Sequence, residues 1–196
     1  MDRIFTALQI RELGPRAGFR RPTQVLAARV TSGSPALGVM TDLTRASPAT
    51  IRAQAPIEAA NQFMIARGVR LLLVADEREE VLGVITATDI LGEKPMRVSV
   101  DRGLTRAELT VGDIMTPAEH VEVLALADVE GARVGHVVET LKRAGRQHAL
   151  VVESNGTRSM VRGIFSVSQI ARQLGLPLQT SEVARTFAEI EAALGH

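Results

Sequence analysis

The sequence contains no cysteine, tryptophan or tyrosine, and only 5 of its 196 residues are phenylalanine. The absence of cysteine excludes disulfides, thiolate metal sites and cysteine nucleophiles, and it fits a reducing compartment. The shortage of aromatic rings disfavours binding of single-stranded nucleic acid, which proteins stack on aromatic side chains. No apolar run approaches the about 18 residues of a transmembrane helix, and the start MDRIFTALQI lacks the layout of a signal peptide. We therefore expect a cytoplasmic protein that does not enter a membrane.

The formal net charge is +1, so no overall field attracts nucleic acid or a membrane surface. The four histidines do not have the spacing of a metal-binding helix. The sequence contains no nucleophile elbow, no Walker loop and no G-x-G-x-x-G segment. We therefore predict no catalytic residue, no metal site and no cofactor, and we expect that the protein is not an enzyme.

Four segments of the sequence recur in the same order. VMTD, from Val39, corresponds to IMTP, from Ile114, 75 residues later. IEAANQFMIARG corresponds to VGHVVETLKRAG, and LLVAD corresponds to ALVVE, both after 77 residues. GVITATDI, from Gly83, corresponds to GIFSVSQI, from Gly163, 80 residues later. Matches in this order indicate an internal duplication.

Each repeat is predicted to have the element order β-α-β-β-α. Apolar residues three and four positions apart indicate the first helix, and Gly68 and Gly145 stand where these helices would end. The expected strands cover residues 47–53, 71–75 and 81–86, and then 121–126, 148–152 and 160–165. A closing helix is expected from Thr86 and from Ser166. A unit of about 50 residues is too small to be stable alone, so the repeats should pack together.

The chain divides into an N-terminal arm (1–36), a first repeat (37–95), a linker (96–110), a second repeat (111–176) and a C-terminal helix (177–196). The arm carries arginines among glycines and prolines, and we expect it to lie on the surface or to wrap around a dimer. The C-terminal helix has an apolar stripe, formed by Val183, Phe187, Ile190 and Leu194. This stripe and the apolar faces left by the packed repeats predict a twofold homodimer.

The repeated element order, the M-T-x segments and the ending G-h-h-[ST]-x-x-D resemble a tandem pair of CBS domains. The likeness covers roughly residues 37–176. It implies an α/β protein of the α+β type, in which two β-α-β-β-α CBS repeats pack with pseudo-twofold symmetry. Such pairs commonly bind AMP, ATP or S-adenosylmethionine between the repeats. The resemblance therefore implies a stand-alone regulatory module that senses an adenosine nucleotide or derivative and acts on an effector protein of unknown identity.

The octapeptide GVITATDI supplies the candidate residues of a ligand site. A helix that begins at Thr86 offers free N–H groups to a phosphate, and an ionised Asp89 would accept hydrogen bonds from the two hydroxyls of a ribose. The resemblance implies that further residues line the purine and contact the phosphate. The complete predicted site is Gly83, Val84, Thr86, Asp89, Thr50, Ile51, Arg146 and His148.

A second, weaker site is predicted at Ser166, Gln169 and Arg70. The amide of Gln169 has no charge to strengthen a hydrogen bond from ribose, so we expect one ligand per chain. Both octapeptides have another explanation, because Ser/Thr-x-x-Glu/Gln is the pattern of a helix capping box. We expect ligand contact at Asp89 and helix capping at Gln169.

Two alternatives to a ligand sensor stay open on the sequence. The chain could be a ligand-free dimeric interaction scaffold, in which both octapeptides only cap helices. It could also be an accessory to a purine enzyme such as IMP dehydrogenase.

Overall fold

The computed structural model describes residues 30–156, 158–175 and 190 of the chain. The predicted C-terminal helix and the larger part of the predicted N-terminal arm lie outside these residues. Ile190 is the exception within the C-terminal helix, and it is fully buried against the core of the second repeat.

The first repeat contains two central strands whose bounds agree with the prediction. Its elements are β2 (Thr50–Ile51), α1 (Ile57–Arg67), β3 (Leu71–Ala75), β4 (Val81–Thr86) and α2 (Ala87–Leu91). The predicted first strand, 47–53, is wrong in length, because only two of its residues pair with β3. α1 ends at Gly68 in the left-handed conformation, with φ of 63°, which glycine adopts without steric cost.

The second repeat has the same order with one additional helix. Its elements are β6 (Val123–Ala125), α5 (Leu126–Glu130), α6 (Val134–Arg143), β7 (His148–Asn155), β8 (Arg158–Ser166) and α7 (Val167–Gln173). The predicted strand 121–126 is too long at both ends, because β6 begins at Val123 and α5 begins at Leu126. The strands β7 and β8 extend beyond the predicted bounds and form a long hairpin. As predicted, Gly145 follows α6, with φ of 61°.

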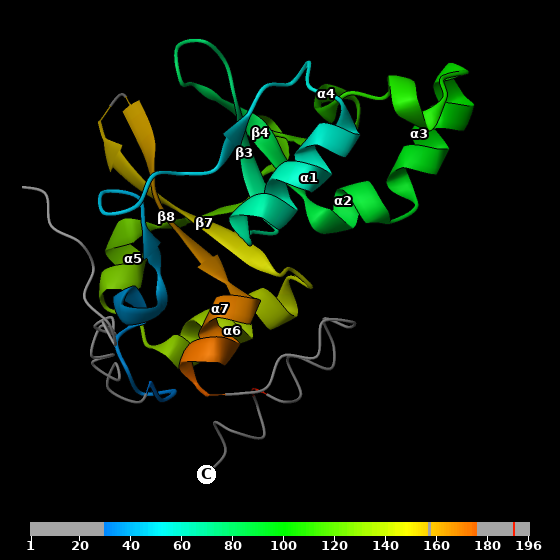
Figure 1. The fold of residues 1–196 in the computed structure, drawn as a ribbon. Coiled ribbons are helices and arrows are strands. Elements are labelled where there is room, and N and C mark those ends of the chain that lie inside the picture. The colour runs from blue at the N-terminus through cyan, green and yellow to red at the C-terminus, as the bar shows by residue number, and fades with distance from the viewer. Residues whose placement is uncertain (1–29, 157, 176–189, 191–196) are drawn as a thin grey trace, which may run out of the picture.

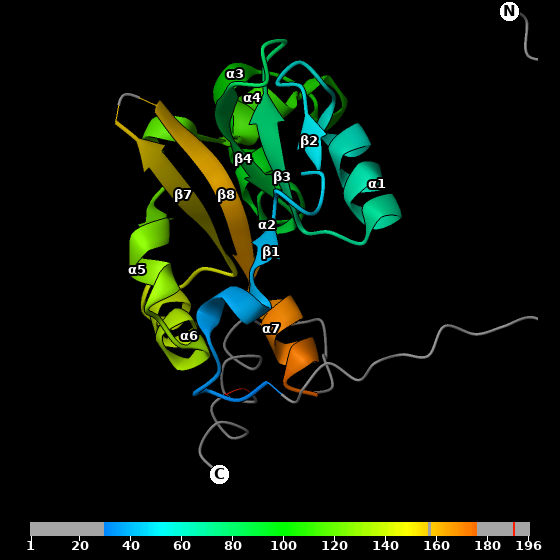
Figure 2. The same cartoon turned by 90° about the vertical axis from the view of Figure 1, so that its left-hand side faces the viewer.

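The M-T-x segment at the start of each repeat, which we call its lead-in, pairs with the sheet of the other repeat. The first lead-in is residues 39–42, and the second is residues 114–117. β1 (Thr41–Asp42) runs antiparallel to β8, and β5 (Thr116–Pro117) runs antiparallel to β4. The two four-stranded sheets therefore have the orders β1-β8-β7-β6 and β2-β3-β4-β5. Figures 1 and 2 show β1 beside β8, although the two segments are far apart in the sequence. This exchange explains why the M-T-x segments recur with the repeats.

Apolar side chains bury each sheet against its own helices and also join the repeats. One core lies under α6 and α7, and a second lies between α1, α2 and the sheet of the first repeat. A third cluster combines Leu71, Leu73 and Val84 with Leu150 of β7. All five residues of β3 are buried, which is typical of a strand that is covered on both faces.

The predicted linker, 96–110, contains most of an additional helix, α3 (Lys94–Arg102), which lies at the periphery of the molecule (Figure 1). Pro95 stands in its first turn, where a missing N–H has no cost, and Gly103 ends it with φ of 65°. Arg102 of α3 forms an ion pair with Asp113 of α4 (Val111–Ile114). The segment between the repeats is therefore a structured element, and residue 95 lies in the first turn of α3.

None of the helices in the described residues is long and apolar enough to cross a lipid bilayer.

Candidate ligand-binding clefts

Two related clefts lie where the octapeptide of one repeat meets the lead-in of the other. The first, which we call the Asp89 cleft, has a volume of about 290 Å³. Its lining includes Val84, Thr86, Asp89, Thr116, Glu122, Arg146 and His148. The second, the arginine cleft, has a volume of about 380 Å³. Its lining includes Thr41, Arg67, Arg70, His148, Ser166, Gln169 and Arg172.

Helix capping was predicted at Gln169, but the structure shows it at Asp89. The Thr86 N–H and hydroxyl donate to Asp89 Oδ2 at 2.9 and 2.7 Å, and the Asp89 N–H donates to Thr86 Oγ1 at 3.3 Å. Asp89 therefore completes a capping box at the start of α2. Ser166 makes no such hydrogen bond, and the capping predicted for Gln169 is wrong. Gln169 Oε1 instead accepts a hydrogen bond from the Thr41 hydroxyl at 3.4 Å.

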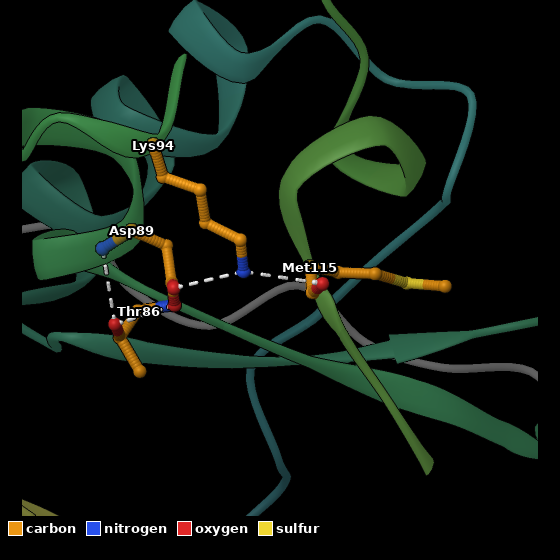
Figure 3. Close-up of polar contacts among 4 residues, drawn as sticks. All are labelled: Thr86, Asp89, Lys94 and Met115. Atoms are coloured by element: carbon orange, nitrogen blue, oxygen red, sulfur yellow. Dashed lines mark hydrogen bonds and ion pairs between the residues drawn. The ribbon is translucent and has the colours of Figure 1, made fainter. Parts of the chain in front are cut away.

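The other oxygen of Asp89 contacts a lysine that the sequence prediction missed. Lys94 Nζ lies 3.3 Å from Asp89 Oδ1 and donates a second hydrogen bond to the Met115 carbonyl at 3.4 Å. Figure 3 shows the ammonium group between the carboxylate and the start of the second lead-in. Lys94 comes from the first turn of α3, so its proximity depends on the helix that was predicted as linker.

The two clefts differ in charge. Asp89 and Glu122 bring two carboxylates to the first cleft, and Arg146 forms an ion pair with Glu122 at 3.0 Å. Among the described residues, the lining of the second cleft contains three arginines and no acidic residue. Of these, Arg70 is half-buried. A phosphate would therefore meet a more favourable field in the arginine cleft.

His148 lines both clefts, as does Leu71. Burial, and to a smaller extent the positive charge of Arg70, lowers the pKa of His148 to about 4. The ring is therefore neutral near pH 7, so it can offer one donor and one acceptor to a ligand.

Five residues of the predicted site meet in the Asp89 cleft: Val84, Thr86, Asp89, Arg146 and His148. Gly83 does not line it, because its backbone packs against β5. A Cβ atom there would lie 2.3 Å from the Thr116 carbonyl oxygen. The absence of a side chain therefore permits the exchanged strand to approach, which is a structural role.

Thr50 and Ile51 do not belong to the Asp89 cleft, and their prediction is corrected. They line a separate cavity of about 560 Å³ at the other end of β3 and β4. The reason is the sheet order, because β2 is at one edge and β5, which borders the Asp89 cleft, is at the other. Val121 and Glu122, which precede β6 in the second repeat, line the Asp89 cleft instead.

The predicted second site is brought together as expected. Ser166, Gln169 and Arg70 line one cleft, and Arg67 and Arg172 join them. The sequence could have indicated Arg67, since it lies on the last turn of a predicted helix that ends beside Arg70. Among the described residues, no three histidine or acidic side chains are grouped as metal ligands.

Comparison with known proteins agrees with this architecture. Residues 39–95 match the model of the CBS domain family. The CBS-pair protein CBSX2 of Arabidopsis thaliana is 18% identical, with a TM-score of 0.50, over 71% of this chain and 93% of that one. Residues 39–95 therefore resemble a CBS domain, and the chain has the fold of a tandem CBS pair.

Two further structures resemble this chain. An uncharacterised conserved protein from Pyrococcus horikoshii is 20% identical, with a TM-score of 0.54, over 78% of this chain and 100% of that one. CBSX2 in complex with AMP is 18% identical, with a TM-score of 0.49, over 73% of this chain and 94% of that one. No curated protein gives a significant match.

Proposed function

We propose that this CBS pair is a regulatory module that binds an adenosine nucleotide or derivative between its repeats and transmits its occupancy to a partner protein. The observation that carries the proposal is the pair of related clefts, each at the joint between the two repeats. A ligand in either cleft touches both repeats, so its binding favours one arrangement of the pair over others. The proposal assigns no catalytic step to either cleft.

The Asp89 cleft suits the nucleoside part of such a ligand. Asp89 supplies acceptors for hydroxyl groups, and Val84 and Leu150 supply apolar surface for a flat ring. The cleft holds few groups for a highly charged phosphate, because Arg146 is already paired with Glu122. That pair is exposed, with Glu122 78% accessible, and an exposed pair is weak enough for one phosphate to replace the carboxylate.

The arginine cleft suits the phosphates. Arginines at the end of α1, just before β3 and on α7 line it, so both repeats contribute basic residues. We therefore propose that the second cleft, predicted as the weaker site, is the stronger one for ligands with two or three phosphates. Its Gln169 would accept from ribose without a charge, and the arginines would supply the affinity.

Isothermal titration calorimetry with adenosine, AMP and ATP tests the function. Binding of adenosine that is weakened by Asp89→Asn, together with binding of ATP that is weakened by Arg70→Met, would support both assignments. GTP serves as the control for base recognition. Absence of heat with all the adenosine compounds, at concentrations up to about 100 times a micromolar Kd, would contradict the function.

A second function, that of an interaction scaffold, is favoured by one observation. Leu91, Met96 and Val100 lie on α2 and α3 with exposed fractions of 66%, 66% and 76%. We propose that the protein is a homodimer, and light scattering should give about twice the 21.0 kDa mass of the chain. A dimer that binds none of the adenosine compounds would favour the scaffold over the sensor.

A further inference from the structure

Lys94 connects three parts of the molecule that belong to different elements. It stands at the first position of α3, its ammonium group is 3.3 Å from the carboxylate of Asp89, and it donates to the carbonyl of Met115. Asp89 belongs to the octapeptide of the first repeat, and Met115 precedes the exchanged strand β5 of the second repeat. Figure 3 shows that the lysine reaches from α3 across to both groups.

The contacts of Asp89 leave little capacity for a ligand. Oδ2 accepts two hydrogen bonds from Thr86, which is the usual number for one carboxylate oxygen. Oδ1 accepts the hydrogen bond from Lys94 and has one lone pair left. A vicinal diol has two hydroxyl donors to place. It can direct both to Oδ1 only if Lys94 leaves that oxygen.

The hydrogen bond between Lys94 and Asp89 can be exchanged for a ligand, whereas the hydrogen bonds between Thr86 and Asp89 cannot. The side chain of Lys94 is 40% exposed, against 19% for Asp89, so water can solvate the released ammonium group. An ion pair at such a place contributes little free energy and is readily exchanged for another partner. Release of Asp89 by Thr86 would break the first turn of α2, because these bonds satisfy the N–H groups there.

We propose that Lys94 is a positioning residue that competes with the ligand for Asp89. The cleft therefore selects ligands with a vicinal diol, and their binding changes the contacts of α3. Without ligand, Lys94 holds α3 to the Asp89 cleft and to the second lead-in. A ribose that takes Oδ1 displaces Lys94 and loosens the start of α3. The proposal rests on the proposed function, because it requires an adenosine compound in the Asp89 cleft.

Calorimetry with adenosine and with 2′,3′-dideoxyadenosine tests the competition. Lys94→Met removes the competing charge and keeps the length of the side chain. It should raise the affinity for adenosine about two- to fivefold and leave the affinity for dideoxyadenosine unchanged. Lys94→Arg keeps a positive charge and should retain the wild-type ratio of the two affinities. Arg97→Met is the matched control, because it removes another positive charge from α3 that pairs only with Glu93 among the contacts of the described residues.

Amide hydrogen exchange tests whether ligand binding loosens the start of α3. Adenosine should speed amide exchange in residues 94–102 of the wild type, dideoxyadenosine should not, and Lys94→Met should exchange faster without any ligand. Equal changes for both nucleosides in Lys94→Met would overturn the proposal and leave the proposed function intact. If neither the wild type nor the variants bind adenosine, the proposed function fails and the role of Lys94 fails with it.

Discussion

His148 and Arg70 line the same cleft, and the charge of Arg70 adds to burial in lowering the pKa of the His148 ring to about 4. The ordinary value is 6.5, so the folded protein keeps this ring neutral over a range where the unfolded chain protonates it. Because Leu71 and His148 border both clefts, a change in the charge of the ring alters the wall that the two sites share.

The stability of the protein should therefore depend on pH through His148. Between about pH 6.5 and about pH 4 the unfolded state binds more protons at this residue, so the free energy of unfolding should fall as the pH is lowered. Urea unfolding across this range should show a smaller fall for His148→Gln than for the wild type. The exposed His120 is the control, and His120→Gln should keep the wild-type dependence. Parallel curves for His148→Gln and the wild type would contradict the lowered pKa of His148.

The capping box at α2 makes a second prediction, which needs no ligand. Thr86→Ala removes the acceptor for the Asp89 N–H and should lower the free energy of unfolding by about 0.5–2 kcal/mol. Ser166→Ala changes the corresponding position of α7, where the side chain caps nothing, and should change stability by less than about 0.5 kcal/mol. Chemical unfolding of both variants measures the difference. Equal losses of unfolding free energy in the two variants would mean that Thr86 does not cap α2 more strongly than Ser166 caps α7.

Binding of adenosine should depend on the charge of Asp89. Asp89→Asn keeps the shape of the side chain but removes the charge, and hydrogen bonds to charged groups contribute roughly 1.5–3 kcal/mol. We therefore expect the affinity for adenosine to fall about 10- to 100-fold by calorimetry. Asp101→Asn, on the exposed side of α3, is the control and should bind as the wild type does. An unchanged affinity in Asp89→Asn would exclude the proposed ribose contact.

The duplication and the central strands could be predicted because they depend on local patterns. β3 and β4 have the predicted bounds, since a run of apolar residues and a polar loop determine where each strand begins and ends. The exchange of β1 and β5 could not be predicted, because two-residue strands have no periodicity. The same exchange decides which cleft each first strand borders, and this is why Thr50 and Ile51 were assigned to the wrong one.

Long-range contacts explain what else the sequence did not predict. TATD ends in an acid and SVSQ ends in an amide. The capping-box pattern Ser/Thr-x-x-Glu/Gln matches the second, so it predicted capping by Gln169. In the structure Gln169 turns to Thr41 of the other repeat, a partner 128 residues away. Lys94 was missed for a similar reason, because its contact with Asp89 depends on a helix whose apolar residues Met96 and Val100 are exposed. Such a helix lacks the buried stripe by which helices are predicted.

The charge of the arginine cleft should separate phosphorylated from unphosphorylated ligands. Arg70 shares the cleft lining with Gln169 and is the one of the three arginines that is half-buried, so we expect it to contribute most to holding a phosphate. Arg70→Met keeps much of the apolar stem and should weaken ATP binding about 10- to 100-fold, as expected for loss of a charge-assisted hydrogen bond. Adenosine, which carries no phosphate, should keep its affinity within about twofold.

The matched control for this variant is Arg45→Met, which removes an exposed arginine that does not line the cleft. The affinity of the wild type for ATP should also fall as salt is raised, while that for adenosine should not, because salt screens only the charged ligand. The salt dependence should become less steep in Arg70→Met and stay the same in Arg45→Met. If Arg70→Met binds ATP as tightly as the wild type with the same salt dependence, the phosphates do not occupy the arginine cleft. Weaker ATP binding in Arg146→Met would then assign them to the Asp89 cleft, where Arg146 would have exchanged Glu122 for the ligand.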